Sequence, residues 1–221
     1  MAHLCSRQLC LVSLIAVQTP VWPASAAQAL SISFGAVQDA AVVDTLTNPL
    51  GNIPDLMINT GNSSLGLVQF DVSAIPAGSV ITDADLNLFH NLFPQIGITY
   101  HVFRNTSSWN EATVTYTTRP LIAPGPVASL TILDDNVLAL RTWDVPGVVQ
   151  GWVDGTFANF GFTVMRDPDA PDWAHFSSRE APTVTHRPSL NVDFQPVPEP
   201  ATLLLVAIGL TRLSVPMRHR T

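Results

Sequence analysis

Apolar residues recur at every second position in short runs along this chain of 221 residues. In one such run, Val68, Phe70 and Val72 alternate with Gln69 and Asp71. Successive side chains of a β-strand point to opposite faces, so this spacing collects the apolar side chains on one face. The pattern is typical of strands that lie half buried against a core.

The same alternation predicts strands over most of the middle of the chain. They are expected at residues 67–72, 83–92, 98–104, 113–117, 138–144, 161–166 and 188–194. Residues that favour turns separate these runs, as in the Pro- and Gly-containing segments 76–78 and 124–126. Many short strands at short intervals predict an all-β fold, an antiparallel β-sandwich of the jelly-roll kind.

One segment has the spacing of a helix instead. Its apolar residues follow the 3.6-residue period: Val145, Val148, Val149, Trp152 and Val153. We expect Asp144 to cap the first turn and Gly155 to end the helix. The sandwich is therefore expected to carry one short helix.

The distribution of charge argues against one class of partner. The chain has ten Arg and no Lys, and residues 30–196 contain six Arg against sixteen Asp and Glu. Binding through phosphates requires a basic surface, so no nucleic-acid partner is expected. The chain also lacks G-x-S-x-G, H-E-x-x-H and P-loop motifs.

Residues 1–29 have the features of a secretory signal peptide. A basic start precedes an apolar run at 9–17 and a string of small residues, and cleavage is expected after Ala26 or Ala29. A buried N-terminal helix is the alternative, which the prolines after the apolar run disfavour. Both cysteines lie in this segment, so the processed protein is expected to contain no disulfide.

Residues 197–221 combine a proline-rich spacer, a short apolar run and a basic terminus. A membrane-spanning helix needs about 20 apolar residues, and Arg212 interrupts this run earlier. With Pro198, Glu199 and Pro200 at its start, the segment resembles a PEP-CTERM sorting signal. The resemblance implies that these three residues are a recognition motif for an exosortase-type machinery and that an apolar helix associates transiently with the inner membrane. A C-terminal amphipathic appendage is the alternative.

The domain between the two signals, residues 30–196, also resembles a known family. Ordered similarities include SWNEATVTYTTRP at 108–120 and HFSSREAPTVTHRPSLNVDF at 175–194, with further ones at 66–89 and 144–164. These segments resemble the DNRLRE domain, which is related to the disaggregatase and to carbohydrate-binding modules. The resemblance implies a secreted β-sandwich. The six-letter string that names the family is absent here.

Glycan binding requires exposed aromatic rings for stacking, with polar groups beside them for the hydroxyls. The candidate glycan-binding residues are Trp109, Trp143, Trp173 and Arg179. Trp173, beside several acids and near Arg179, is the first to test. For each tryptophan, packing in the core is the more frequent role.

Acidic residues suggest two further roles. Asp167, Asp169 and Asp172 lie in one loop and form a weak candidate site for Ca²⁺, which prefers hard oxygen ligands. A solvated turn is the alternative for this loop. In the loop after Trp109, Glu111 is expected to accept backbone N–H bonds and to pair with Arg119.

These features together predict an exported, non-catalytic protein of the cell surface or extracellular matrix, and the PEP-CTERM resemblance implies that it comes from a biofilm-forming bacterium. It is expected to have a structural role or to associate with an extracellular polysaccharide, and to need no cofactor beyond a structural Ca²⁺. A polysaccharide-degrading enzyme is the alternative, because sixteen acids leave room for a catalytic pair of carboxylates.

Overall fold

The computed structural model describes residues 28–59, 63–92, 96–133, 138–167 and 174–197. Its strands are β1 (Leu30–Val43), β2 (Asp55–Ile58), β3 (Ser64–Phe70), β4 (Val80–Leu92), β5 (Ile98–Arg104), β6 (Ala128–Ile132), β7 (Ala139–Asp144), β8 (Phe162–Arg166), β9 (Ala174–Ser177) and β10 (Ser189–Gln195). A short helix, α1 (Pro146–Val153), follows β7, and a 3₁₀ turn, Val184–His186, precedes β10. All strand pairs are antiparallel.

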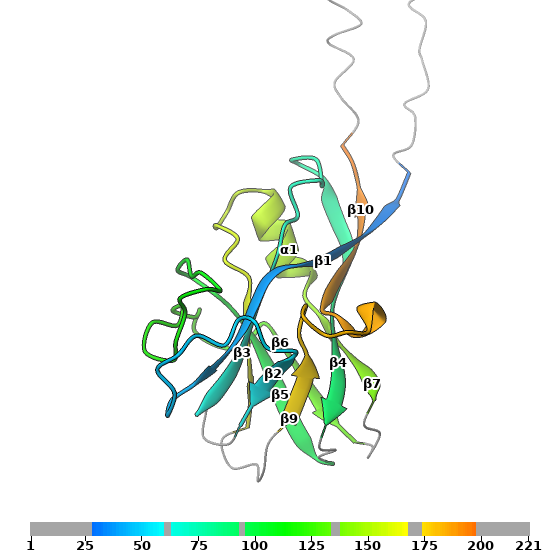
Figure 1. Cartoon of the computed structure of the whole chain (residues 1–221). Coiled ribbons are helices and arrows are strands. Elements are labelled where there is room, and N and C mark those ends of the chain that lie inside the picture. Colours follow the sequence, from blue (N-terminus) through cyan, green and yellow to red (C-terminus); the bar gives the residue numbers. More distant parts are fainter. Residues whose placement is uncertain (1–27, 60–62, 93–95, 134–137, 168–173, 198–221) are drawn as a thin grey trace, which may run out of the picture.

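The strands form two layers that share β1 (Figure 1). The first half of β1, Leu30 to Gly35, pairs with β10, and β10 continues to β4, which also pairs with β7 and β9. The second half pairs with β3, followed by β8, β5 and β6. The register shifts between Ala36 and Gln38, where the two halves meet. A bulge bends a strand, which allows β1 to pass from one layer into the other.

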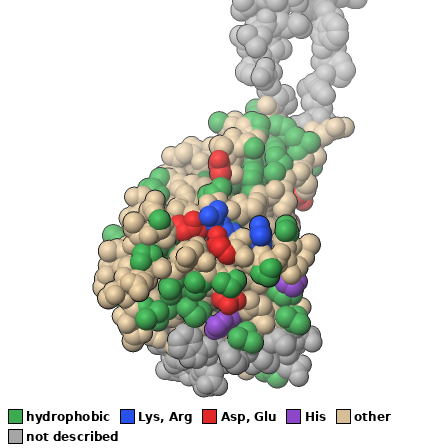
Figure 2. Space-filling view, in the orientation of Figure 1, with side chains coloured by type: hydrophobic (Ala, Val, Ile, Leu, Met, Phe, Trp, Pro, Cys, Tyr) green, Lys and Arg blue, Asp and Glu red, His purple; other side chains and the backbone are tan. Residues whose placement is uncertain are grey.

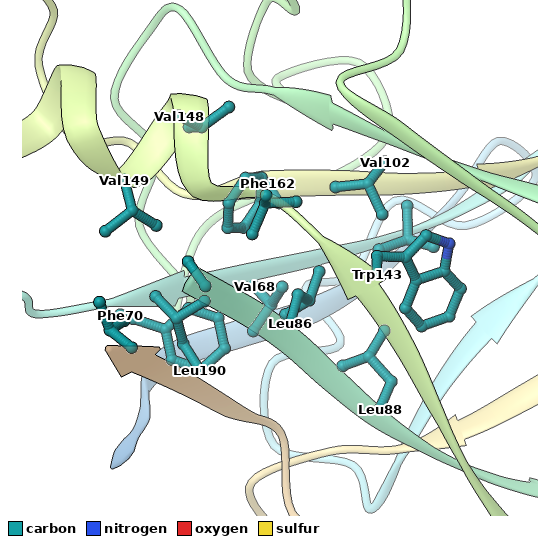
Figure 3. Packing of buried hydrophobic residues seen from close by; sticks show 14 of the residues in the cluster. Val68, Phe70, Leu86, Leu88, Val102, Trp143, Val148, Val149, Phe162 and Leu190 are labelled. Atoms are coloured by element: carbon teal, nitrogen blue, oxygen red, sulfur yellow. The ribbon is translucent and has the colours of Figure 1, made fainter. Parts of the chain in front are cut away.

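The core fills the space between these layers and beneath α1 (Figure 3). Tyr100 on β5 and Phe176 on β9 meet edge to face, with ring centroids 5.4 Å apart. Trp143 on β7 donates its Nε1–H to the carbonyl oxygen of Tyr100 at 3.2 Å. On the helix, Trp152 packs against Phe162 of β8 at 4.9 Å. Contacts of this kind join the layers and confirm the predicted antiparallel β-sandwich with one short helix.

Two local predictions were wrong. Residues 113–117 lie in a loop of turns and irregular backbone rather than in a strand, because Val114 is buried in a small second core and neighbouring groups form hydrogen bonds within the loop. For example, the Val114 N–H donates to the Asn110 carbonyl at 2.8 Å, and the Thr115 N–H donates to Thr118 Oγ1 at 2.9 Å. Asp144 does not cap α1 because it is the last residue of β7; the helix starts after Val145 without a side-chain cap.

The two described ends of the chain lie side by side, because Leu30 at the start of β1 pairs with Phe194 near the end of β10 (Figure 1). The predicted signal peptide up to residue 27 and the predicted sorting segment from residue 198 lie outside the described residues. Within the described ranges, no helix has the length and apolarity needed to cross a bilayer.

Candidate functional site

A charged cluster forms where β1, the loop after β5 and the segment after β9 meet. The guanidinium of Arg179 makes a bidentate contact with the carboxylate of Glu111: Nε donates to Oε1 and Nη2 donates to Oε2, each at 2.9 Å. Arg179 Nε also lies 3.0 Å from Oε1 of Glu180. Bidentate pairing of a guanidinium with a carboxylate fixes both position and orientation. The side chain of Arg179 stays 38% exposed, so it reaches solvent while it is held in place.

Asp39 on β1 lies beneath this pair and is buried, with 1% of its surface exposed. The backbone N–H of Arg179 donates to Asp39 Oδ2 at 2.7 Å, and the backbone N–H of Asp39 donates to Glu111 Oε1 at 3.0 Å. Burial raises the pKa of Asp39 to about 8, and repulsion from Glu180 and Glu111 acts in the same direction. The hydrogen bond from the backbone N–H of Arg179 acts in the opposite direction and lowers this pKa. The cluster thus contains a buried carboxyl group whose charged form is costly.

Neighbouring side chains hold the loops that carry the cluster. The Glu111 N–H donates to Gln38 Oε1 at 3.2 Å, which ties the loop after β5 to β1. Ser178 Oγ donates to the Ile53 carbonyl at 2.6 Å and accepts from the Glu180 N–H at 3.1 Å. Hydrogen bonds therefore hold three chain segments that are distant in sequence together around Arg179.

Two hollows open on either side of Arg179 and Glu180, which line both of them. The first, of about 390 Å³, is bordered by Gly51, Asn52 and Glu111 among others. The second, of about 560 Å³, is bordered among others by Ser33, Arg187 and Ser189. We call these two hollows and the residues between them the Arg179 surface. Figure 2 shows acidic and basic side chains gathered near the middle of one face of the molecule.

The tryptophans predicted to bind glycan are placed differently from one another. Trp143 is 1% exposed and packs against Phe176, so its assignment as a stacking platform was wrong. Trp109 is half buried beside the second core, and its Nε1–H donates to the Phe160 carbonyl at 2.9 Å. Trp173 lies outside the described residues. The sequence could not separate these roles because the burial of a tryptophan depends on contacts with segments far away in the chain.

Of the predicted polar candidates, Arg179 is the one that the fold places at an exposed surface with hollows beside it. Glu111 accepts a backbone N–H bond, but the donor is Asp39 on β1 and not a residue of its own loop, and its charged partner is Arg179 and not Arg119. Arg119 instead lies over the ring of Tyr116, 4.0 Å from its centroid. Glu111 and Arg179 are 68 residues apart, and no local spacing pointed to the pair.

The loop predicted to bind Ca²⁺ is described only at its first acid. Asp167 accepts a hydrogen bond from His101 Nε2 at 2.9 Å, and this bond lowers the pKa of Asp167. Asp169 and Asp172 lie outside the described residues. Elsewhere in the described ranges, one carboxylate oxygen from each of Asp39, Glu111 and Glu180 lies within 4.8 Å of the other two.

A second group of three acids meets the same distance criterion. It consists of Asp83, Asp85 and Asp144 on the neighbouring strands β4 and β7. Burial raises the pKa of Asp85, and repulsion from Asp83 and Asp144 adds to this effect. These side chains are exposed or half buried, unlike Asp39.

Comparison with known families adds one finding. The family model for carbohydrate-binding module family 96 matches residues 31–193, nearly the whole span from β1 to β10. No curated protein shows a significant similarity to the chain. The matched span exceeds half of the chain and coincides with the sandwich that carries the Arg179 surface. The chain therefore belongs to carbohydrate-binding module family 96.

Proposed function

We propose that this protein is exported and binds an extracellular polysaccharide without cleaving it, at the Arg179 surface. Membership of a carbohydrate-binding module family supports the sugar ligand. The observation that carries the choice of surface is that Arg179, oriented by Glu111, lines two adjoining hollows. A preoriented polar group needs little ordering when a ligand binds.

The chemistry of the surface suits sugar hydroxyls, which both donate and accept hydrogen bonds. Arg187 and Arg179 offer donors, Glu180 offers acceptors, and the hydroxyls of Ser33 and Ser189 offer both. Among the described residues, the large apolar side chains that are exposed include no aromatic ring. We therefore expect binding through the described part of the chain to use directed hydrogen bonds at the Arg179 surface. Half-buried Trp109 and, by the sequence prediction, Trp173 stay candidate platforms for ring stacking.

The first prediction concerns Arg179. Replacing Arg179 by lysine keeps the charge but removes the planar fork, so affinity for matrix polysaccharide is expected to fall about tenfold. Affinity is measured by calorimetry with the purified protein, after a glycan array has identified a ligand. The matched control is Arg119→Lys, the same change outside the Arg179 surface, which is expected to bind like the wild type.

Two results would contradict this site. If Arg179→Lys binds as tightly as the wild type while folded, the ligand does not use the Arg179 surface. If Arg119→Lys weakens binding instead, the sugar occupies the hollow of about 270 Å³ that Arg119 lines with Thr117 and Met165. Circular dichroism of both variants shows whether either change disturbs the fold.

Catalysis by paired carboxylates has weaker support. Asp39, Glu111 and Glu180 lie close enough together for such a pair, but Asp39 is buried and lines neither hollow. Glu111 uses both of its carboxylate oxygens to hold Arg179. Turnover of the bound polysaccharide that disappears in Glu180→Gln, with the fold retained, would establish the enzymatic alternative.

The second prediction concerns export and anchoring through the two terminal segments. We propose that a secretory machinery removes residues up to Ala26 or Ala29 and that an exosortase-type machinery acts at Pro198, Glu199 and Pro200. Mass spectrometry of protein released by the producing cells is expected to find neither residues 1–26 nor residues after 200. Secreted protein that retains both ends would contradict the proposal.

A further inference from the structure

We infer that Asp39, Glu111 and Glu180 form a binding site for a divalent cation of the Ca²⁺ type. Calcium takes oxygen ligands at about 2.3–2.6 Å, so two ligands of one ion lie at most about 5 Å apart. One oxygen of each of these carboxylates lies within 4.8 Å of the others. The three groups can therefore reach one ion without a rearrangement of the backbone.

Asp39 supplies the observation that points to a missing ligand. Its Oδ2 accepts a hydrogen bond from the backbone N–H of Arg179, but its Oδ1 is buried and has no hydrogen-bond partner among the described residues. An unpaired carboxylate oxygen in a buried position is costly, because folding removes its water without replacing it. A bound cation would supply the missing interaction for this atom.

The charge of the cluster agrees with a divalent ion. Three carboxylates and the guanidinium of Arg179 leave two negative charges when all four groups are ionised. Arg179 is already included in this sum, so two further positive charges, as on one divalent cation, would balance the cluster.

An ion has a route into the cluster. Glu111 and Glu180 both border the first hollow, which opens to solvent beside Arg179. Arg179 also donates from Nη1 to the Val37 carbonyl at 3.2 Å, a bond that involves none of the three acids. That bond and the one from Nη2 to Glu111 Oε2 keep the guanidinium in place when an ion takes oxygens of the cluster.

This inference does not depend on glycan binding, and its test contains no sugar. The full chain is stripped of metal with a chelator, and its thermal midpoint is measured as CaCl₂ is added. At a hundredfold excess over Kd, a site that exists only in the folded state raises Tm by about 5–10 °C for a chain of this size. We expect this rise in the wild type.

Variants locate the ion. Asp39→Asn and Glu180→Gln keep the size of each side chain but remove a charged ligand, so the Ca²⁺-dependent rise in Tm is expected to disappear in both. Metal-free Asp39→Asn is expected to melt no lower than the metal-free wild type, because the change relieves repulsion. The matched control is Asp85→Asn in the group formed by Asp83, Asp85 and Asp144, which is expected to keep the full rise.

A spectroscopic measurement covers the case in which Asp39→Asn does not fold. Tb³⁺ replaces Ca²⁺ at oxygen sites, and a nearby tryptophan sensitises its emission. Trp109 lies two residues from Glu111, and its carbonyl is 3.4 Å from Gln38 Nε2. Emission excited through tryptophan is expected in the wild type and Trp109→Phe is expected to lose most of it.

Four outcomes would overturn the inference, three of them in the thermal measurement. One is the absence of any Ca²⁺-dependent change in Tm for the wild type. Another is a rise that persists unchanged in Glu180→Gln, and a third is a rise that disappears in Asp85→Asn. Tb³⁺ emission that keeps its full strength in Trp109→Phe would likewise place the ion away from this cluster.

Discussion

Replacing Trp143 by alanine is expected to lower the free energy of unfolding by about 3–5 kcal/mol, the usual cost of truncating a large buried aromatic side chain. Trp143 is 1% exposed and packs against Phe176 with ring centroids 6.0 Å apart. It also joins the layers, because its Nε1–H donates to the Tyr100 carbonyl. Urea unfolding followed by circular dichroism measures the change.

Trp143→Phe is the matched control for this prediction. It keeps most of the buried surface but leaves the Tyr100 carbonyl without its donor, so it is expected to cost about 1–3 kcal/mol. Trp143→Ala and Trp143→Phe are each expected to bind polysaccharide like the wild type under conditions in which the variant is folded. A Trp143→Ala protein with unchanged stability and lost sugar binding would restore the glycan-binding role that the structure argues against.

Replacing Gly161 by alanine is expected to destabilise the fold by about 2–5 kcal/mol, from two separate causes. Gly161 has φ of +75°, a conformation that costs an alanine about 1–2 kcal/mol. An added Cβ would also lie 2.2 Å from the Val68 carbonyl oxygen and 2.8 Å from the Gln69 Cα. These are backbone atoms of β3, which pairs with β1 and β8 and cannot move aside freely.

Gly78→Ala separates the two causes. Gly78 has a similar φ of +79°, but nothing lies within 4 Å of an added Cβ. This variant is therefore expected to lose only the conformational part, about 1–2 kcal/mol. Equal losses of stability in Gly161→Ala and Gly78→Ala, measured by urea unfolding, would show that the clash with β3 is relieved by local movement.

Local sequence predicted those parts of the fold that depend on local contacts. The strands now seen as β3, β4, β5, β7, β8 and β10 each overlap a run of alternating residues. The apolar face of α1 was predicted correctly, with Val149 and Trp152 buried, and Gly155 follows the helix at φ of +68°. By contrast, β1, β2, β6 and β9 overlap none of the predicted runs. Of these, β2 and β9 have four residues each, which is too short for an alternation to stand out.

The composition and order of residues thus determined the fold class, because the faces of strands and helices follow from spacing along the chain. The tertiary structure alone decided the features on which the proposed function depends. The transfer of β1 between layers, the burial of Trp143 and the meeting of Asp39, Glu111 and Arg179 all join segments far apart in sequence. Such contacts depend on strand order and register, which no local pattern of residues specifies.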